Sequence, residues 1–573
     1  MLFIEALYES AVVPRRAWIQ FLTILLLGAS VFTRKSFRLP EKLFSSVILI
    51  LISFACSFFF AVDQASSLLR LIEWGTLLLL CCIIACTAGP RQIFWILWGS
   101  SFAATLVSCI GMAQFFWNWD FYPQTIAPAS TFFNKNFAAE YLVTVLPASF
   151  FLIFRSDQKI RLLQTVAFFL QFIYLIMTRS RASWLGFGIA VVLFLQSRYR
   201  LREGASLLKS RRGKTVAFCF FVGVIILFFF NASRITHDLG KLDSVRQRLV
   251  LWTNSLAMGA EHPFFGVGLG NFYALYPLYH QRILTDTTFK LEQEPYETHN
   301  DLYQIALECG LLGFLVFFIF LFQLFRLGKK SAFDTNATSE NATSTRASVF
   351  GIVALIINSF FSFPLRNPTS AMMFWVWVGV LFSQSSEFTI KKIKTIPLLR
   401  ILVFAGLTGS IFFSTLSFLG DYHLKRAKLA SYQQLRLPAL THIFLAETYF
   451  PWDSQIWRER SVIQTRFSTD WKKNVLVLES IRKKDPYYLN NLINLALAYR
   501  KTQQYTQSRE TYETVLQIRP EEFHSLLGMG LLFWEQNDLE QANLWIKKAQ
   551  EQSPQDPILL RFLETTLQKE KRE

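Results

Sequence analysis

The sequence predicts an all-α fold: a polytopic bundle of about twelve transmembrane helices followed by an α-helical repeat domain. Of the 573 residues, 52% are hydrophobic and only 17% are charged, and the mean hydropathy is +0.31. The apolar residues form runs of about twenty, which is the length that a helix needs to cross the hydrocarbon core of a bilayer. This composition excludes both a single water-soluble globule and a disordered chain.

Twelve apolar runs predict membrane spans, and the connectors between them set their orientation. The most basic connector, 198–214, carries seven Lys and Arg residues against one Glu, so we expect it on the cytoplasmic side. The same alternation places four other basic connectors on that side. The predicted spans are 17–33, 43–62, 68–88, 93–116, 137–154, 162–178, 183–197, 215–230, 303–325, 347–365, 369–384 and 398–419.

This orientation divides the chain into four predicted regions. Residues 1–230 hold the first eight spans, 231–302 form an extracytoplasmic loop, 303–420 hold the last four spans, and 421–573 form an external repeat domain. The N-terminus is also expected outside, despite Arg15 and Arg16. No cleavable signal peptide is recognisable, so the first apolar run is expected to remain as a span.

Pro486, Pro520 and Pro554 mark a 34-residue period in the polar C-terminal region. Apolar residues recur in one register between them, as in the helix pairs of tetratricopeptide repeats. Two clear units are fewer than the usual three, so we expect the helix-like stretch 425–485 to supply a degenerate one. Such units stack into a concave surface, which here either docks a partner or serves as a spacer.

The net charge of +18 raises the question of nucleic acid, but the basic residues lie mainly in short connectors between apolar runs. There they set membrane topology, so we expect no nucleic-acid partner. None of the seven cysteines lies in the long loop or in the C-terminal region, which excludes a disulfide framework and a C-x-x-C metal site.

Polar residues around His299 are the first candidates for catalysis. His299 and Asn300 lead into the ninth predicted span, and Asp301 and Glu308 follow. A helix cap and the helix dipole explain Asn300 and Asp301. They do not explain Glu308, about two turns into an apolar helix, where an ionisable residue is costly. His299 is the side chain best suited to accept a proton near neutral pH.

Four arginines form a second group of candidates. Arg179 and Arg181 lie at the predicted external end of the sixth span, and Arg246 and Arg248 lie in the long loop. Arginine binds phosphate oxygens with paired hydrogen bonds, so these residues predict an anion site. Arg179 and Arg181 also fit a simpler role, in which they reach out to lipid headgroups.

Two other motifs have simpler explanations. Gly266, Gly268 and Gly270 resemble a dinucleotide fingerprint, but no strand precedes them, so we expect a tight-turning interfacial loop. Asn134, just before the fifth span with Glu140 one turn in, is explained by a capped helix start.

Taken in order, these motifs resemble the O-antigen ligase and polymerase family of multi-spanning glycosyltransferases. The resemblance is best between residues 130 and 325, and the H-x10-G spacing of His299 and Gly310 is associated with the ligases. The motifs are Asn134-Lys135-Asn136-Phe137-Ala138-Ala139, Thr178-Arg179-Ser180-Arg181-Ala182-Ser183-Trp184, Arg248 with Trp252, His262-Pro263 before Gly266-Val267-Gly268, and His299-Asn300 before Glu308-Cys309-Gly310-Leu311-Leu312-Gly313.

The resemblance implies transfer of a glycan from a polyprenyl diphosphate carrier to a hydroxyl of a glycolipid, glycan or protein, at the periplasmic face of the bacterial inner membrane. No nucleotide or metal ion would be needed. His299 would activate the acceptor, with Glu308 or Asp301 orienting its ring. The leaving diphosphate gathers negative charge, which preorganised arginines stabilise most in the transition state. The residues for that role are Arg179, Arg181, Arg246 and Arg248.

Several alternatives remain open at this point. A glycan polymerase or a protein O-oligosaccharyltransferase would use the same motifs, and the fused repeats favour a protein or large polymer as acceptor. A transporter of lipid-linked sugars would place ionisable residues deep in several spans, whereas Glu73 and Glu308 are nearly the only acids there. A membrane scaffold whose repeats bind a protein partner would leave the arginine and histidine motifs without a role.

Overall fold

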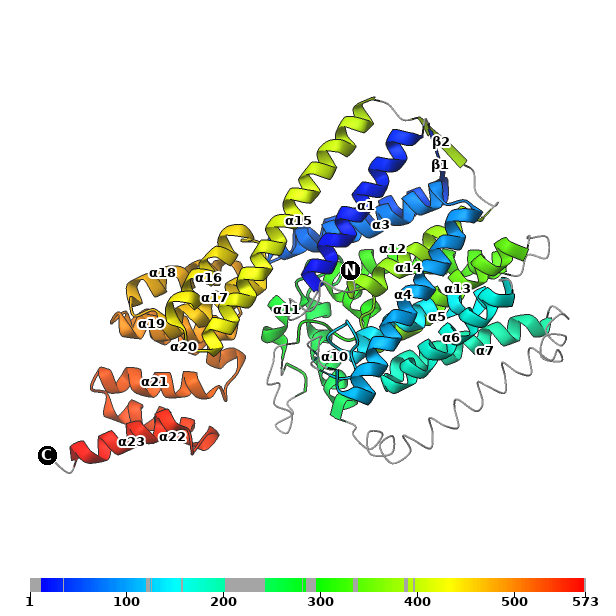
Figure 1. Cartoon of the computed structure of the whole chain (residues 1–573). Helices are drawn as coiled ribbons and strands as arrows, with labels where there is room; N and C mark the ends of the chain where they lie inside the picture. The colour runs from blue at the N-terminus through cyan, green and yellow to red at the C-terminus, as the bar shows by residue number, and fades with distance from the viewer. Residues whose placement is uncertain are drawn as a thin grey trace.

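The structure is a computed structural model of the chain. It describes residues 12–34, 36–119, 124, 126–155, 158–200, 243–280, 282–284, 295–332, 339–385, 390–394 and 397–570. These residues form a bundle of long apolar helices, loops and short helices gathered at one end of it, and a stack of shorter helices that leads away to the C-terminus (Figure 1). The predicted all-α class, with a membrane bundle and a helical repeat region, is confirmed.

Eight of the described helices are long and apolar enough to cross a membrane, and the shorter apolar helices α7 and α14 accompany them. Eleven of the predicted spans coincide with a described helix, and 215–230 lies outside the described residues. The number of spans therefore stays a prediction. The bundle helices are α1 (Val12–Thr33), α2 (Glu41–Phe58), α3 (Gln64–Thr87), α4 (Pro90–Trp117), α5 (Lys135–Arg155), α6 (Gln158–Met177), α7 (Arg181–Arg200), α12 (Asp301–Ala332), α13 (Ser339–Ser359), α14 (Pro368–Ser383) and α15 (Pro397–Tyr432).

One predicted boundary is wrong in a way that matters for the site. The span predicted at 347–365 corresponds to α13, which already ends at Ser359. Pro364 and Pro368 follow, and proline both lacks an N–H donor and disfavours helix in the residue before it. Residues 360–367 therefore form a loop between α13 and α14, and this loop carries Arg366.

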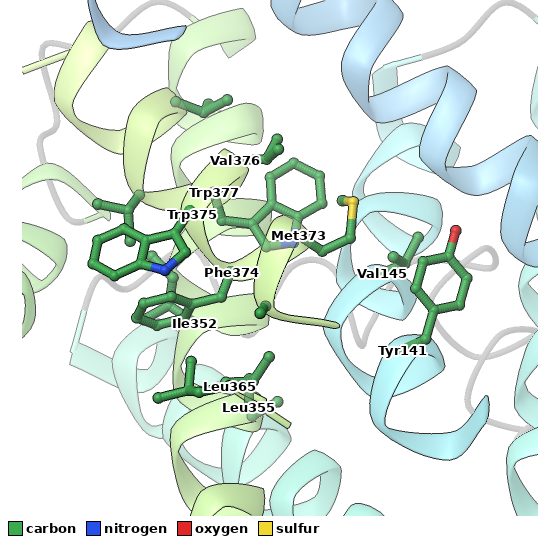
Figure 2. Close-up of a cluster of buried hydrophobic side chains, with 14 of the residues drawn as sticks. Tyr141, Val145, Ile352, Leu355, Leu365, Met373, Phe374, Trp375, Val376 and Trp377 are labelled. Carbon is green, nitrogen blue, oxygen red and sulfur yellow. The ribbon is translucent and has the colours of Figure 1, made fainter. Parts of the chain in front are cut away.

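Helices α5, α13 and α14 enclose the most densely buried part of the bundle (Figure 2). Trp375 and Trp377 of α14 are fully buried, and the indole N–H of Trp377 donates to the carbonyl oxygen of Thr144 at 3.0 Å. Tyr141 and Val145 of α5 lie across from them (Figure 2). In a bilayer such close packing, rather than the exclusion of water, holds helices together.

The two ends of the bundle collect different connectors. Strands β1 (Ser36–Pro40) and β2 (Ile390–Lys394) pair antiparallel, which joins two connectors that were both predicted to be cytoplasmic. At the other end, the start of α1 meets the loops that were predicted to be external, and Arg15 donates to the carbonyl oxygen of Thr131 at 2.8 Å. The predicted grouping of connectors agrees with this arrangement. Which end faces the periplasm stays a prediction.

The C-terminal region consists of paired helices. α19 packs on α20 and α21 packs on α22, as the 34-residue period predicts. The stretch 425–485 contains the end of α15 and three further helices that continue the stack. The helices are α16 (Arg436–Tyr449), α17 (Ser454–Phe467), α18 (Trp471–Lys484), α19 (Leu489–Lys501), α20 (Tyr505–Ile518), α21 (Phe523–Glu535), α22 (Leu539–Gln552) and α23 (Pro557–Glu570).

Candidate functional site

A break in α12 shapes the end of the bundle where the site lies. The helix is interrupted at Gly310, whose φ is 63° and ψ is −169°. A tight loop fills the break, and the N–H of Gly268 donates to the carbonyl oxygen of Glu308 at 2.9 Å. A Cβ on Gly310 would lie 2.3 Å from the carbonyl oxygen of Phe264, so only glycine fits. The glycines of the loop 266–270 and Gly310 therefore allow the backbone of this loop to pack closely against the broken helix α12.

His299 stands just outside the first turn of α12. The side chain of Asn300 accepts the N–H of Tyr303 at 3.0 Å and caps the helix, so α12 begins at Asp301. His299 itself has a φ of 57°, a strained conformation that is uncommon for residues other than glycine. Its half-buried ring packs on Phe363, with the ring centroids 5.1 Å apart.

Helix α10 (Asp243–Glu261) is held beside His299 through Trp252. The indole N–H of Trp252 donates to the carbonyl oxygen of Thr298 at 2.7 Å. Arg248 lies one turn earlier on the same face of α10, so this contact also brings its guanidinium toward His299. In the part of the chain that the structure describes, Arg248 makes no hydrogen bond or ion pair.

The turn between α6 and α7 presents Arg179 and Arg181. Arg179 has a φ of 53°, which reverses the chain within two residues. The turn is rigid because the indole N–H of Trp184 donates to the carbonyl oxygen of Leu175 at 3.0 Å. Arg179 is half-buried at the turn, and Arg181 is exposed at the start of α7.

The charges of three of these groups act on one another. Burial and the charge of Arg248 lower the pKa of His299 to about 4, so its imidazole is neutral at pH 7. Burial and the charge of Arg181 lower the pKa of Arg248 from its ordinary value. The structure thus brings together Arg181, Arg248 and His299 from three separate segments, and we call these three residues the basic cluster. Arg246 is exposed on α10.

Glu308 and Asp301 are buried and already hydrogen-bonded. The carboxylate of Glu308 accepts from Arg366 at 2.5 Å, from the N–H of Gly270 at 2.7 Å and from Gln304 at 3.0 Å. Asp301 accepts the N–H of Leu365 at 2.9 Å. None of the hydrogen bonds described for these two carboxylates reaches His299, whose ring lies against Phe363 instead.

Arg366 belongs to a chain of alternating charges that crosses the end of the bundle. The chain runs through the pairs Arg366–Glu297 (3.2 Å), Glu297–Arg70 (3.0 Å), Arg70–Glu73 (3.1 Å) and Glu73–Arg16 (2.9 Å). Burial disfavours the charge of Arg366, but the carboxylates of Glu297 and Glu308 outweigh this and hold its pKa above the ordinary value. Buried charges persist only when they are paired in this way.

A cavity of about 260 Å³ adjoins this chain of charges, and we call it the interdomain cavity. It opens between the bundle and the repeat domain. Its charged lining consists of four arginines and four acids, so their formal charges cancel. The charged residues are Arg15, Arg16, Arg70, Arg366, Glu73, Glu297, Glu308 and Asp453, and the aromatic residues are Phe132, Phe137, Tyr273, Tyr296, Phe363, Phe413 and Phe450.

The repeat domain supplies one wall of the interdomain cavity. Phe450 and residues 453–455, at the turn between α16 and α17, line it. Arg458 of α17 fixes this turn against the bundle. Its guanidinium pairs with Asp485 at 2.8 Å and lies over the ring of Tyr273, 4.7 Å from the centroid. Such a cation–π contact between buried groups is favourable by about 2 kcal/mol.

Phe363 connects the two parts of the site. Its ring contacts His299, lines the interdomain cavity and packs on Phe137 with centroids 5.6 Å apart. Glu297, two residues before His299, also lines the cavity. His299 therefore stands at the boundary between the basic cluster and the cavity.

None of the four arginines of the cavity was among the sequence candidates. Arg15 and Arg16 were treated as flanks of the first span, Arg70 lies inside a predicted span, and Arg366 lies between two apolar runs. One signal was present, because Arg366 is the only basic residue between positions 347 and 390. A single basic residue at the end of the bundle that is otherwise poor in basic residues does not set membrane topology, so it indicates a functional or structural role.

The predicted helix start at Asn134 is confirmed, since its side chain accepts the N–H of Asn136 at 2.9 Å. Glu140 is buried one turn later and accepts from Ser362 at 2.5 Å and from Asn367 at 3.3 Å. It thereby ties α5 to the loop that carries Arg366. Among the described residues, no group of three or more His, Cys, Asp or Glu side chains is arranged to hold a metal ion.

Comparison with known families supports this picture. The profile of the family described as O-Antigen ligase matches residues 166–318, which include the whole basic cluster and the break in α12. The profile of the tetratricopeptide repeat matches residues 489–522, which include α19 and α20. Both resemblances expected from the motifs are confirmed. No curated protein matches the chain significantly.

Proposed function

We propose that this O-antigen ligase-like membrane protein transfers an oligosaccharide or polysaccharide from a polyprenyl diphosphate carrier to an acceptor hydroxyl. The observation that carries the proposal is the convergence of two arginines and a neutral imidazole within the matched region 166–318. The charged connectors predict that the site lies on the extracytoplasmic side, and the family resemblance implies that this side is the periplasmic face of a bacterial inner membrane.

The arginines of the basic cluster suit the diphosphate of the donor. Burial and the nearby charge of Arg181 both disfavour the charge of Arg248, and a bound dianion would offset this effect. When the glycosidic bond breaks, its electron pair stays on the diphosphate oxygen. The guanidinium groups then stabilise more charge in the transition state than in the bound donor. The proposal includes Arg179, which lies two residues before Arg181 in the same turn, in this role.

His299 suits the acceptor side of the reaction. The acceptor oxygen forms a bond to the anomeric carbon, the bond to the diphosphate oxygen breaks, and the acceptor proton passes to the neutral imidazole. A pKa of about 4 makes a weak base, but part of that lowering comes from Arg248. A bound diphosphate offsets this charge, so we expect donor binding to raise the pKa of His299 toward the range that favours proton transfer.

The buried acids argue against the transporter alternative. Glu73 and Glu308 are each paired with arginine, and both belong to the network at one end of the bundle. A transporter needs ionisable groups near the middle of the membrane that can change partners. A glycan polymerase and a protein O-oligosaccharyltransferase remain alternatives within the same chemistry, because they differ only in the acceptor.

The test is reconstitution of the full-length protein in proteoliposomes with a polyprenyl diphosphate-linked glycan. We expect release of free polyprenyl diphosphate together with a glycan-modified acceptor, at a rate that a metal chelator does not change. In cells, deletion of the protein should lead to accumulation of the lipid-linked precursor, and a reporter fused at residue 425 should report an external position. Movement of the intact lipid-linked glycan across the bilayer without cleavage would contradict the proposal.

A further inference from the structure

We infer that the interdomain cavity is the acceptor subsite, that it binds an uncharged sugar ring of a glycan acceptor, and that the repeat domain forms its outer wall. This inference rests on the proposed function and names the acceptor class that the function leaves open. It is carried by the composition of the cavity lining, by the position of the cavity next to His299, and by the turn of the repeat domain that closes it.

The first argument is charge. Arg16, Arg70 and Arg366 are each already paired with a carboxylate at 3.2 Å or less. A ligand with net charge of either sign would have to break one of these pairs or remain uncompensated in a largely buried space. The cavity therefore disfavours a diphosphate or a hexuronate, in contrast to the basic cluster.

The second argument is the kind of polar group on offer. A sugar hydroxyl both donates and accepts hydrogen bonds, and the cavity lining presents guanidinium donors beside carboxylate acceptors. Aromatic rings such as those of the exposed Tyr296 and the half-buried Phe363 provide apolar surface for the C–H groups of a sugar ring. A volume of about 260 Å³ lies just below the range of about 300–1,000 Å³ typical of small-molecule sites, so one ring enters and the rest of the acceptor stays outside.

The third argument is position. Phe363 lines the cavity and also contacts the ring of His299, so a sugar held against Phe363 presents its hydroxyls to the boundary with the basic cluster. The donor on the arginines and the acceptor in the cavity would then meet at His299.

The fourth argument concerns the repeats. Asp453 caps α17 by accepting the N–H of Gln455 at 2.9 Å. Burial raises the pKa of its carboxyl group, and this hydrogen bond and the charge of Arg16 across the cavity offset only part of that rise. Because Arg458 holds the same turn rigidly on Tyr273, the wall is preorganised rather than mobile. The repeat domain is therefore part of the acceptor site, in addition to any surface that it offers elsewhere.

The test measures binding of neutral disaccharides, and of hexuronate-containing disaccharides of equal size, to the full-length protein in nanodiscs. Gln455 is the exposed second residue of α17, so Gln455→Trp is expected to narrow the mouth of the cavity without disturbing the fold and to weaken neutral disaccharide binding at least tenfold. Lys472→Trp is the matched control, since Lys472 is the exposed second residue of α18 behind the capping Asp470. The Lys472→Trp variant should bind neutral disaccharides with the same affinity as the wild type.

A second variant addresses charge. Asp453→Asn keeps a good helix cap but leaves the cavity with one uncompensated positive charge, so relative affinity should shift several-fold toward the hexuronate. The inference alone would be overturned if Gln455→Trp bound neutral disaccharides as tightly as the wild type does. It would also be overturned if the wild type transferred glycan and Gln455→Trp had the same KM for the acceptor. Absence of any transfer by the wild type would overturn the proposed function, and the binding measurement would still decide the inference.

Discussion

The basic cluster and the interdomain cavity lie side by side yet differ in how they treat charge. In the basic cluster, burial and the charge of Arg181 lower the pKa of Arg248, and burial and the charge of Arg248 keep His299 neutral. In the cavity, four arginines face four acids and most are paired directly. The first region holds groups of like charge near one another, whereas in the second most charges are paired with a charge of opposite sign.

This difference shows that counting arginines does not locate an anion site. The cavity contains four arginines, as many as the sequence analysis proposed for the anion site, but three of them are paired with carboxylates of the protein itself. What distinguishes a binding arginine is the absence of a carboxylate partner, and in the described chain Arg248 has none. The variants below separate the two kinds of residue by their effect on turnover, folding stability and pH response.

The largest effect on turnover is expected for His299→Ala. Removing the base should lower kcat by about 10²–10⁴-fold, while the protein still folds in the membrane. The measurement is the rate of glycan transfer in proteoliposomes, with His524→Ala, an exposed position of α21, as the control. Turnover equal to that of the wild type would remove His299 from the mechanism.

Arg366→Met should act on stability. It leaves the buried carboxylate of Glu308 without its cation and Glu297 with Arg70 alone, which should cost about 3–5 kcal/mol of unfolding free energy. Unfolding in detergent micelles measures this. The control is Arg282→Met, whose ion pair with Glu261 is exposed and should be worth less than about 1 kcal/mol. Equal losses for the two variants would mean that the buried network does not stabilise the fold.

Arg248→Lys keeps the positive charge but loses the paired hydrogen bonds to phosphate. We expect kcat/KM for the donor to fall about 10–100-fold, because a hydrogen bond to a charged group contributes about 1.5–3 kcal/mol. Steady-state kinetics at varied donor concentration measures this, with Arg509→Lys in the exposed part of α20 as the control. An unchanged kcat/KM would show that only the charge of Arg248 matters.

The smallest effect is expected from pH. With a pKa of about 4 for His299 in the free protein, kcat/KM should change less than about twofold between pH 5 and 7 and fall below pH 4. Because donor binding should raise this pKa, kcat should fall at a higher pH than kcat/KM. Between pH 6.5 and 4 the unfolded chain binds a proton at this histidine that the folded chain does not, so stability should decrease as the pH is lowered through that window. A loss of kcat/KM that begins near pH 6.5 would contradict the lowered pKa.

The sequence predicted the bundle, the repeat period and the members of the basic cluster, because each has a local signature. Apolar run length gives the spans, the spacing of Arg248 and Trp252 places both on one helix face, and Asn300 is a recognisable helix cap. The motifs predicted that arginines such as Arg179 and Arg248 meet His299 in one pocket; the charge of Arg248 acts on His299, and the shared site stays a prediction.

The interdomain cavity has no local signature. The partners of Arg366 are 58 and 69 positions away (366 − 308 and 366 − 297), and Arg16 pairs with a residue of another helix. The sequence analysis did not predict the loop that carries Arg366, because the apolar run of α13 continues past the end of this helix. In the sequence, Gly310 is indistinguishable from an ordinary helix residue, and only the structure shows the backbone of Phe264 packed against it. Such features depend on contacts between distant segments, which spacing alone does not reveal.

The pairing of α1 with α15 has a consequence for biosynthesis. These two helices lie side by side (Figure 1), and Ser414 donates to the carbonyl oxygen of Ala17 across a separation of 397 residues. Helix α1 must therefore wait for α15, the last described helix of the bundle, before Arg15 and Arg16 reach their final surroundings. A nascent chain released before residues 450–455 are made cannot form the interdomain cavity, because these residues line it.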